Sequence, residues 1–415
     1  MVTIDPSQTN IPIYILIYLS IFISSLFFIK KILWSIFDPL VLIIFSLSFN
    51  LATVLYFFES ASLFVLCYFL FSYIIFIAIL STDRSKYLNV STNHQMLDIS
   101  SFKVTASLLV ILILSILILF ILSEIGFGAL TGDVDSNTKV SITQNGFGIF
   151  KYLNYLVNLL IFPIIFHELL VKNRTTLALT LVAIYLIYNL LANFSKAGLL
   201  FLIFDISILF KYYNSDIKKY IIRFKYNIFW LGPVAVAPII ILFNSIMSER
   251  GVDFTYLLLE RFIDTSGGSY QYFILNGKEA FNDIDFSQII LYYFDTILSV
   301  LRFKEWEPLS HMAFMTSFLT GVDNPGFGVN PYMFVDGHLL FGFFGFIYVA
   351  FLGLAIVKSR NFKGGSLLYY SLNKTLLFFI GDPNTAEAYI IGIIIFFLFF
   401  SIYFFANYRQ KIYHL

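Results

Sequence analysis

Long runs of apolar residues, separated by short polar segments, recur along the chain from residue 11 to residue 406. A helix needs about 20 apolar residues to cross the hydrocarbon core of a bilayer. The pattern therefore predicts an all-α, polytopic integral membrane protein with about eleven transmembrane helices. We expect these helices at residues 12–29, 36–58, 61–80, 104–123, 149–171, 177–194, 197–213, 226–244, 338–357, 366–380 and 388–406.

The composition supports this class. Hydrophobic residues make up 59% of the chain and charged residues 12%, whereas soluble domains carry about 25% charged residues. A net charge of +1 gives no reason to expect a nucleic-acid partner. The single cysteine, Cys67, lies inside an apolar run, so neither disulfides nor cysteine metal sites are expected.

Lysine and arginine in the short loops predict the orientation, because basic loops stay on the cytoplasmic side of a membrane. With eleven spans, every basic loop falls on one side, with the N-terminus outside and the C-terminus inside. The span at 366–380 is the weak point, because it contains Asn373 and Lys374. The basic loops contain Lys30–Lys31, Lys172–Arg174, and residues 211–225, 358–363 and 409–411.

One outer loop is much longer than the others. Residues 245–337 hold a large share of the ionisable groups, and no Pro/Gly/Ser-rich linker sets them apart. We therefore expect a single transmembrane domain, 1–415, with one large periplasmic loop that contains amphipathic helices. The apolar stretch 286–301 within the loop fits either a re-entrant or interfacial helix, or part of an extra pair of spans.

The start of this loop repeats a charged pattern, Glu-Arg-x-x-Asp, at an interval of eleven residues. Eleven residues make about three helical turns, so the two copies share one helix face about 16 Å apart. The pattern predicts an amphipathic helix on the outer membrane surface, ended by Thr265–Gly268. Either the charges pair with one another, or the arginines hold an anionic group. The residues are Glu249, Arg250 and Asp253, then Glu260, Arg261 and Asp264.

Other ionisable residues lie at the ends of spans. Lys196 lies at an outer turn between two apolar runs, where it either snorkels or faces a cavity. Asp336 and His338 stand where a Gly/Asn/Pro-rich loop enters a span. They could act as a base and its orienting partner, or could simply mark a helix start. His311 is a second loop histidine, and the pair at 167–168, His-Glu, is expected at the inner interface.

Several catalytic motifs are absent from the sequence, including the Walker-type, His-Glu-x-x-His and Gly-x-Ser-x-Gly patterns. Two Asp-x-Asp patterns, at 133–135 and 283–285, fall outside in the predicted topology. A nucleotide-sugar donor would need its metal-binding carboxylates on the cytoplasmic side. The sequence therefore argues against a nucleotide-sugar glycosyltransferase, and it leaves open an outer-face enzyme that uses a lipid-linked donor and no metal.

Three places resemble the Wzy-type family of O-antigen and oligosaccharide repeat-unit polymerases. One is the turn Ser195-Lys196-Ala197-Gly198, and another is the arginine-containing outer loop. The third runs from Asn330-Pro331 through Asp336 and His338 to Phe341-Gly342. Lysine at 196 replaces a frequent arginine of this family, and aspartate at 336 replaces a common glutamate.

The resemblance implies a metal-independent glycosyltransferase of the bacterial inner membrane, with a plan compatible with the GT-C type. It would polymerise undecaprenyl-diphosphate-linked repeat units at the periplasmic face, for O-antigen or a related polysaccharide. Its partners would be the lipid-linked donor and acceptor, membrane lipids and a chain-length regulator protein, with no cofactor. The alternatives are an O-antigen ligase or other lipid-donor glycosyltransferase, and a flippase or transporter.

The same resemblance assigns roles to the candidate residues. Fixed cations would stabilise the diphosphate leaving group, and a base would take the acceptor hydroxyl proton. Aromatic loop residues would stack on sugars. The diphosphate ligands are Arg250, Arg261 and Lys196; the base is Asp336 or His338; the stacking residues are Tyr270, Tyr272 and Trp306; secondary candidates are Asp253, Asp264 and His311.

Overall fold

The computed structural model describes most of the helical core of the chain in two compact units, and each unit is described by itself. The first contains residues within Met1–Asn89, Phe210–Ile284 and His311–Gly353, and the second those within Val90–Leu209, Asp285–Ser310 and Leu354–Leu415. The described residues are 10–34, 38–59, 62–83, 105–125, 148–170, 172–192, 197–213, 266–294, 297–298, 311–321, 332–362, 365–381, 386–387, 389–394 and 398.

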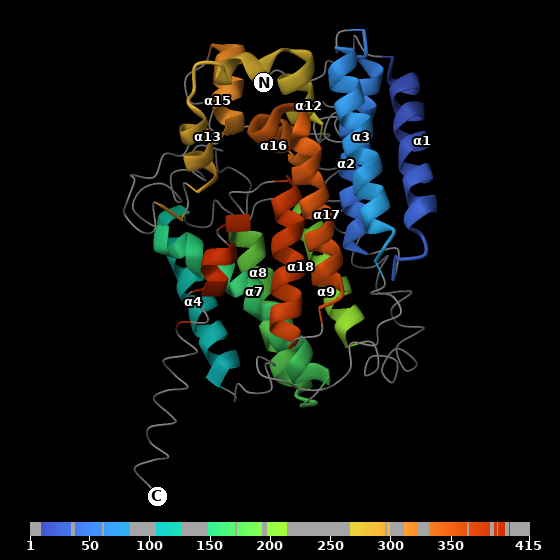
Figure 1. The fold of residues 1–415 in the computed structure, drawn as a ribbon. Coiled ribbons are helices and arrows are strands. Elements are labelled where there is room, and N and C mark those ends of the chain that lie inside the picture. The colour runs from blue at the N-terminus through green and yellow to red at the C-terminus, as the bar shows by residue number, and fades with distance from the viewer. Residues whose placement is uncertain are drawn as a thin grey trace, which may run out of the picture. The chain divides into compact units, whose positions relative to one another are not determined.

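The described residues of the first unit are helical and contain no strand (Figure 1). Three long helices, α1, α2 and α3, lie side by side, and short helical elements from the predicted loop accompany them. The elements are α1 (Ile11–Ile29), α2 (Pro39–Tyr56), α3 (Leu63–Leu80), α12 (Gly267–Ser269), the π-helix η2 (Tyr270–Ile274), the 3₁₀-helix η3 (Gly277–Phe281), α15 (His311–Thr320), α16 (Tyr332–Phe341), the 3₁₀-helix η4 (Gly342–Gly345) and the first half of α17 (Phe346–Arg360).

The described secondary-structure elements of the second unit are also helices. Within it, α4, α7 and α8 pack against one another, and α18 packs against α7. Its helices are α4 (Thr105–Ile125), α7 (Gly148–Leu170), α8 (Thr175–Ala192), most of α9 (Ala197–Tyr212), α13 (Phe286–Tyr293), the end of α17, and α18 (Ser366–Gly381).

The predicted all-α membrane architecture is confirmed. Among the described residues, five helices are long and apolar enough to cross a membrane: Ile11–Ile29, Pro39–Tyr56, Leu63–Leu80, Leu153–Leu170 and Tyr332–Arg360. Val110–Ser123 and Thr175–Tyr188 are shorter apolar helices. The predicted span at 226–244 lies outside the described residues, as does most of the span at 388–406. The count of eleven spans therefore stays a prediction.

Polar residues before the apolar runs explain where the first three helices begin. An N-cap side chain accepts a hydrogen bond from an otherwise unpaired amide of the first turn. The Asp38 carboxylate accepts from the amides of Leu40 at 3.0 Å and Trp34 at 3.1 Å, and Pro39 occupies the first helical position. Asn10 and Ser62 cap α1 and α3 in the same way. The starts of these three helices are therefore determined by capping residues that directly precede the apolar runs.

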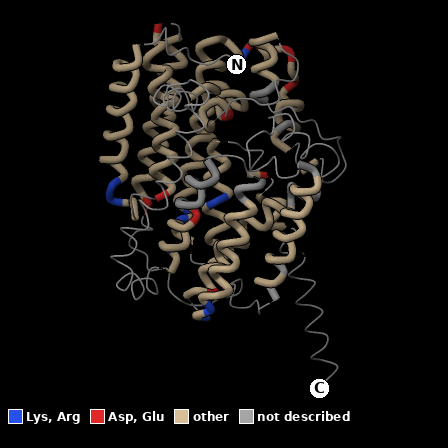
Figure 2. The backbone as a smooth tube through the Cα atoms, turned by 180° about the vertical axis from the view of Figure 1, so that it is seen from behind, with Lys and Arg blue, Asp and Glu red and all other residues tan. Residues whose placement is uncertain are grey.

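The outer faces of several helices are apolar. In α4, Leu108, Leu112, Ile116 and Leu119 recur every three or four residues and are all exposed. Figure 2 shows long stretches of described helix without any charged residue. A contiguous apolar face of this length is unfavourable in water, so it fits contact with lipid.

The helix that carries Asp336 differs from the predicted span at 338–357. It starts earlier, at Tyr332, and a 3₁₀ turn at 342–345 interrupts it, with Gly342 at φ 57°. Asp336 and His338 therefore lie inside α16 and do not mark a loop-to-span boundary. Glycine makes the interruption possible, because it adopts a positive φ without steric cost.

The same turn brings two glycines into direct backbone contact. A Cβ added at Gly345 would overlap the carbonyl group of Gly337 and lie 2.7 Å from the amide nitrogen of His338. A Cβ at Gly337 would lie 2.8 Å from the carbonyl oxygen of Gly345. Only hydrogen fits between the two backbones, so this contact holds the His338 segment against η4.

Gly345→Ala is therefore expected to destabilise the protein by about 1–3 kcal/mol, because rigid backbone atoms have to separate. The measurement is the melting temperature in detergent, followed by near-UV circular dichroism. Gly392→Ala is the control, since its Cβ would lie no closer than 3.5 Å to any neighbour. Equal melting temperatures for the two variants would contradict the proposed backbone contact.

Candidate functional site

The first candidate site surrounds His338, in the first unit. Its ring is partly exposed and makes edge-to-face contacts with the rings of Tyr68 at 5.2 Å, Phe273 at 5.1 Å and Tyr272 at 5.6 Å. The hydroxyl of Tyr272 is 3.2 Å from Nδ1 of His338. Three aromatic rings and one hydrogen bond therefore fix the imidazole in a single orientation.

Tyr68 supports the helix that carries the histidine. Its hydroxyl donates to the backbone oxygen of Phe334 at 2.7 Å, and the residue is fully buried. Tyr68 comes from α3 and Phe334 from α16, so this bond joins two helices that are distant in sequence. The contact positions α16 near the ring of His338.

The segment that delivers Tyr272 is buried in the helical unit. Ser266, Ser269 and Gln271 are fully buried, and Tyr272 is 3% exposed. The expected surface helix that Thr265–Gly268 would end lies outside the described residues, whereas Gly267 and Gly268 lie within a short helical turn, α12. This turn packs against α2 and α16.

Hydroxyl and amide groups hold this buried turn in place. The hydroxyls of Thr53 and Ser266 are 2.7 Å apart, and Ser269 donates to the side-chain oxygen of Asn50. Further along, Thr316 of α15 donates to Gln271 at 2.9 Å. Every bond satisfies a polar group that would otherwise be costly in an apolar interior.

Tyr272 itself lies on a π-helix, η2. Short π-helical turns are rare and are frequently found at functional sites. A second unusual feature lies at the start of α16, where Tyr332 has a φ of 53°. A bulky residue with a positive φ is strained, and such strain is concentrated at functional sites. Both segments that form the His338 site thus carry uncommon backbone conformations.

Asp336 does not pair with His338 in the way that the sequence suggested. Residues at i and i+2 on a helix point to different sides, and Asp336 is 1% exposed whereas His338 is partly exposed. Tyr272, which had been expected to stack on sugars, is the residue that orients the histidine. Burial, and then the charge of Asp336, raise the pKa of the Tyr272 hydroxyl, so both residues of α16 act on this tyrosine.

The remaining predicted residues of the loop are mostly outside the described part of the chain. His311 begins α15, and Tyr270 packs against Phe57 at 5.1 Å between ring centres. The residues outside the described ranges are Lys196, Arg250, Asp253, Arg261, Asp264 and Trp306. Their predicted roles stay predictions.

No family model, no curated protein and no solved structure matches the chain. The candidate sites are therefore interpreted from their own geometry.

A second cluster, in the second unit, was not singled out by the sequence. The ammonium of Lys374 donates to Asp205 at 2.7 Å, to the Tyr370 hydroxyl at 3.0 Å and to the backbone oxygen of Asn158 at 3.3 Å. Lys374 and Asp205 are 4% and 5% exposed. The three donors of the lysine meet three acceptors, from helices α9, α18 and α7.

A signal for this pair was present in the sequence. Lys374 is the weak point of the predicted span at 366–380, and Asp205 lies inside the predicted span at 197–213. An ionisable residue within a span is expensive and needs a partner. The opposite charge in another span was the available clue.

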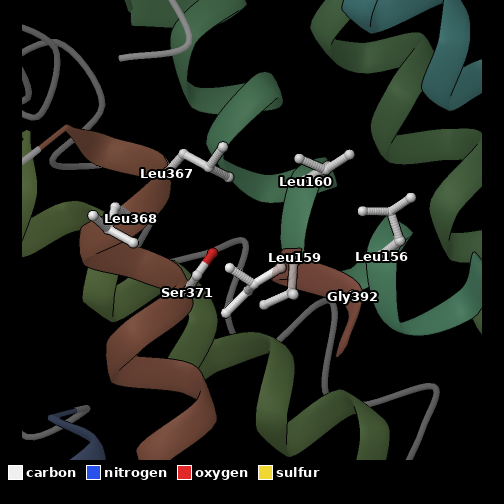
Figure 3. A pocket seen from close by; sticks show the side chains of 8 residues that line it. Leu156, Leu159, Leu160, Leu367, Leu368, Ser371 and Gly392 are labelled. Atoms are coloured by element: carbon white, nitrogen blue, oxygen red, sulfur yellow. The ribbon is translucent and has the colours of Figure 1, made fainter. Parts of the chain in front are cut away.

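Polar groups continue from this pair along α7. Tyr185 donates to the side-chain oxygen of Asn158 at 2.8 Å, and Tyr188 donates to Asn154 at 2.6 Å. Beside them, a small recess with a cavity volume of about 10 Å³ is lined mainly by leucines, together with the hydroxyl of Ser371 (Figure 3). It contains no titratable side chain, so it offers apolar contact and no acid–base chemistry. Its lining is Leu156, Leu159, Leu160, Leu367, Leu368, Ser371, Gly392 and Ile393.

The pair that was expected at the inner interface lies at the C-terminal end of α7. His167 and Glu168 are 1% and 2% exposed, so both are buried among other side chains, and their depth in a membrane stays a prediction. The Glu168 carboxylate accepts from Ser107 at 3.2 Å and lies 3.6 Å from the guanidinium of Arg174. These partners keep the carboxylate inside the helix bundle.

Proposed function

We propose that the protein polymerises oligosaccharide repeat units carried on undecaprenyl diphosphate, at the periplasmic face of the bacterial inner membrane. The observation that carries the proposal is the His338 site. A partly exposed imidazole, oriented by Tyr272, lies two residues from a buried carboxylate on a helix that follows the long loop. The all-α membrane architecture and the sequence resemblance to Wzy-type polymerases support the same conclusion.

The chemistry assigns the residues as follows. A glycan moves from its diphosphate carrier to a hydroxyl of the acceptor glycan, so negative charge develops on the leaving diphosphate. Preorganised cations and hydrogen-bond donors lower the energy of such a transition state. Arg250, Arg261 and Lys196 are the proposed cations, and Asp336 is the proposed base for the acceptor hydroxyl.

Two alternatives to the polymerase are an O-antigen ligase and a transporter, and a structural observation bears on the second. An O-antigen ligase would use the same donor and the same site with a different acceptor. A flippase or other transporter is favoured by the Asp205–Lys374 pair, because ionisable groups buried within spans commonly line transport pathways. The complete set of partners around Lys374 fits a structural role better.

The polymerase proposal predicts the phenotype of a deletion strain. Without the protein, lipid A is expected to carry a single repeat unit, because the unit is still made, flipped and ligated. Lipopolysaccharide electrophoresis shows this as one band above the core and no ladder, and the plasmid-borne gene restores the ladder. A core without any repeat unit would instead indicate a ligase or a flippase.

A further inference from the structure

The hydrogen bond between Tyr272 and His338 bears on which ring nitrogen carries the proton. In a neutral histidine one nitrogen donates and the other accepts, and the partner of one nitrogen sets the state of the other. The described structure gives the His338 ring one hydrogen bond, from Nδ1 to the Tyr272 hydroxyl at 3.2 Å. The tautomer therefore depends on the direction of that bond.

The environment of Tyr272 determines whether its hydroxyl donates or accepts in the hydrogen bond with His338. Burial and the charge of Asp336 raise the pKa of its hydroxyl, so the phenol keeps its proton. The side chain is 3% exposed, and a buried hydroxyl proton needs an acceptor. Among the described residues, Nδ1 of His338 is the acceptor within hydrogen-bond distance. Tyr272 therefore donates to Nδ1, which leaves the ring proton on Nε2.

We propose that Tyr272 is a positioning residue that holds His338 as the Nε2–H tautomer, which makes the histidine a hydrogen-bond donor and not the base. The donor would serve an anionic oxygen of the substrate, and the diphosphate leaving group is the one that fits. The assignment to diphosphate rests on the proposed function, whereas the tautomer does not. The base role then belongs to Asp336.

The aromatic contacts around the ring fix its orientation without competing for the proton. The Tyr68 hydroxyl is already engaged with the backbone oxygen of Phe334, at 2.7 Å. Phe273 offers only its ring, 5.1 Å from that of His338. Tyr68 and Tyr272 thus touch the same imidazole, but only Tyr272 hydrogen-bonds it. This difference provides a matched pair of variants.

The direct test is ¹⁵N NMR of the histidine rings in the full-length protein in nanodiscs. The chain has five histidines, and the His338 signals are those lost in His338→Gln. We expect an unprotonated Nδ1 and a protonated Nε2. Tyr272→Phe should give a mixture of tautomers, whereas Tyr68→Phe, which removes a hydroxyl that does not bond the ring, should keep Nδ1 unprotonated and Nε2 protonated. A protonated Nδ1 in the wild type, or unchanged signals in Tyr272→Phe, would overturn the proposal.

Two substitutions of His338 test the donor by activity. A glutamine amide nitrogen reaches the position of Nε2, and an asparagine amide nitrogen reaches the position of Nδ1. His338→Gln is expected to keep polymerisation within about 10-fold of wild type, whereas His338→Asn should lose about 100- to 1,000-fold, as for removal of a preorganised donor. Equal losses, or a more active asparagine variant, would contradict the donor role.

The NMR signals test the tautomer of His338, and the polymerisation activity tests the proposed reaction, so the two proposals can fail independently. If the wild-type protein extends no glycan, the proposed function fails while the NMR result still decides the tautomer. If polymerisation is present and the NMR signals do not respond to Tyr272→Phe, the positioning role fails while the function stands.

Discussion

Lys374→Met is expected to lower the free energy of unfolding by about 3–5 kcal/mol, because it leaves the buried Asp205 carboxylate without its counter-charge. Two hydrogen bonds of the ammonium, at 2.7 and 3.3 Å, join α18 to α9 and α7, and the third, at 3.0 Å, lies within α18. The measurement is the loss of folded protein with temperature in detergent. At about 2–4 °C per kcal/mol for a chain of this size, the midpoint should fall by roughly 10 °C.

The double variant Asp205→Leu/Lys374→Met is the informative comparison. Replacing both charges of a buried pair is often neutral, so the double variant should recover most of the lost stability. Lys172→Met is the matched control, because its side chain is 23% exposed and its ammonium lies 3.7 Å from Glu168. The Glu168 carboxylate keeps Ser107 and Arg174 as partners without this lysine, so a much smaller loss of stability is expected. A single variant as stable as this control would contradict a structural role for the pair.

The same double variant separates two candidate functions. A structural pair can be replaced by apolar residues without loss of activity. A transport pathway would need its ionisable groups. A folded double variant that still polymerises therefore supports the enzyme, and a folded variant without any surface polysaccharide supports the transporter.

Asp336→Asn is expected to reduce polymerisation by about 100- to 10,000-fold, the range typical of a lost general base. The change removes the charge and keeps the size of a side chain that is only 1% exposed. The ladder of chain lengths should collapse to one repeat unit, while the purified variant still binds the lipid-linked donor. Electrophoresis of lipopolysaccharide and a donor-binding measurement give the two results.

Asp283→Asn provides the control for this experiment. Asp283 is an exposed aspartate in the same unit, so the same chemical change should leave the ladder intact. A normal ladder in a folded Asp336→Asn variant would remove Asp336 as the base. It would leave the carboxylate with a structural role beside Tyr272.

The sequence located most helices to within a few residues, and the exceptions are instructive. The starts of α1, α2 and α3 follow from Asn10, Asp38 and Ser62, each a capping residue directly before an apolar run. The start of α16 was misplaced, because Asp336 and His338 resemble helix punctuation. The His338 side chain is accommodated inside the helix by Tyr272 and Tyr68, which come from distant segments.

For the candidate residues too, the sequence indicated the individual residues, and the structure showed how they contact one another. Asp336, His338 and Tyr272 were identifiable from the sequence as polar or aromatic residues at a predicted outer face. Their relation was not identifiable, because i,i+2 spacing suggested a pair that helix geometry separates. The orienting hydroxyl comes from a residue 66 positions away. The Asp205–Lys374 bond spans 169 positions.

By itself, the sequence determined the all-helical membrane class and the approximate limits of most described helices. These depend on the length of apolar runs and on capping residues, which act over a few neighbouring positions. Only the tertiary structure decided that Tyr272 orients His338, that Gly337 and Gly345 meet through their backbones, and that Lys374 pairs with Asp205. Such contacts depend on which helix faces meet, and an apolar run that is uniform around its axis does not specify a face.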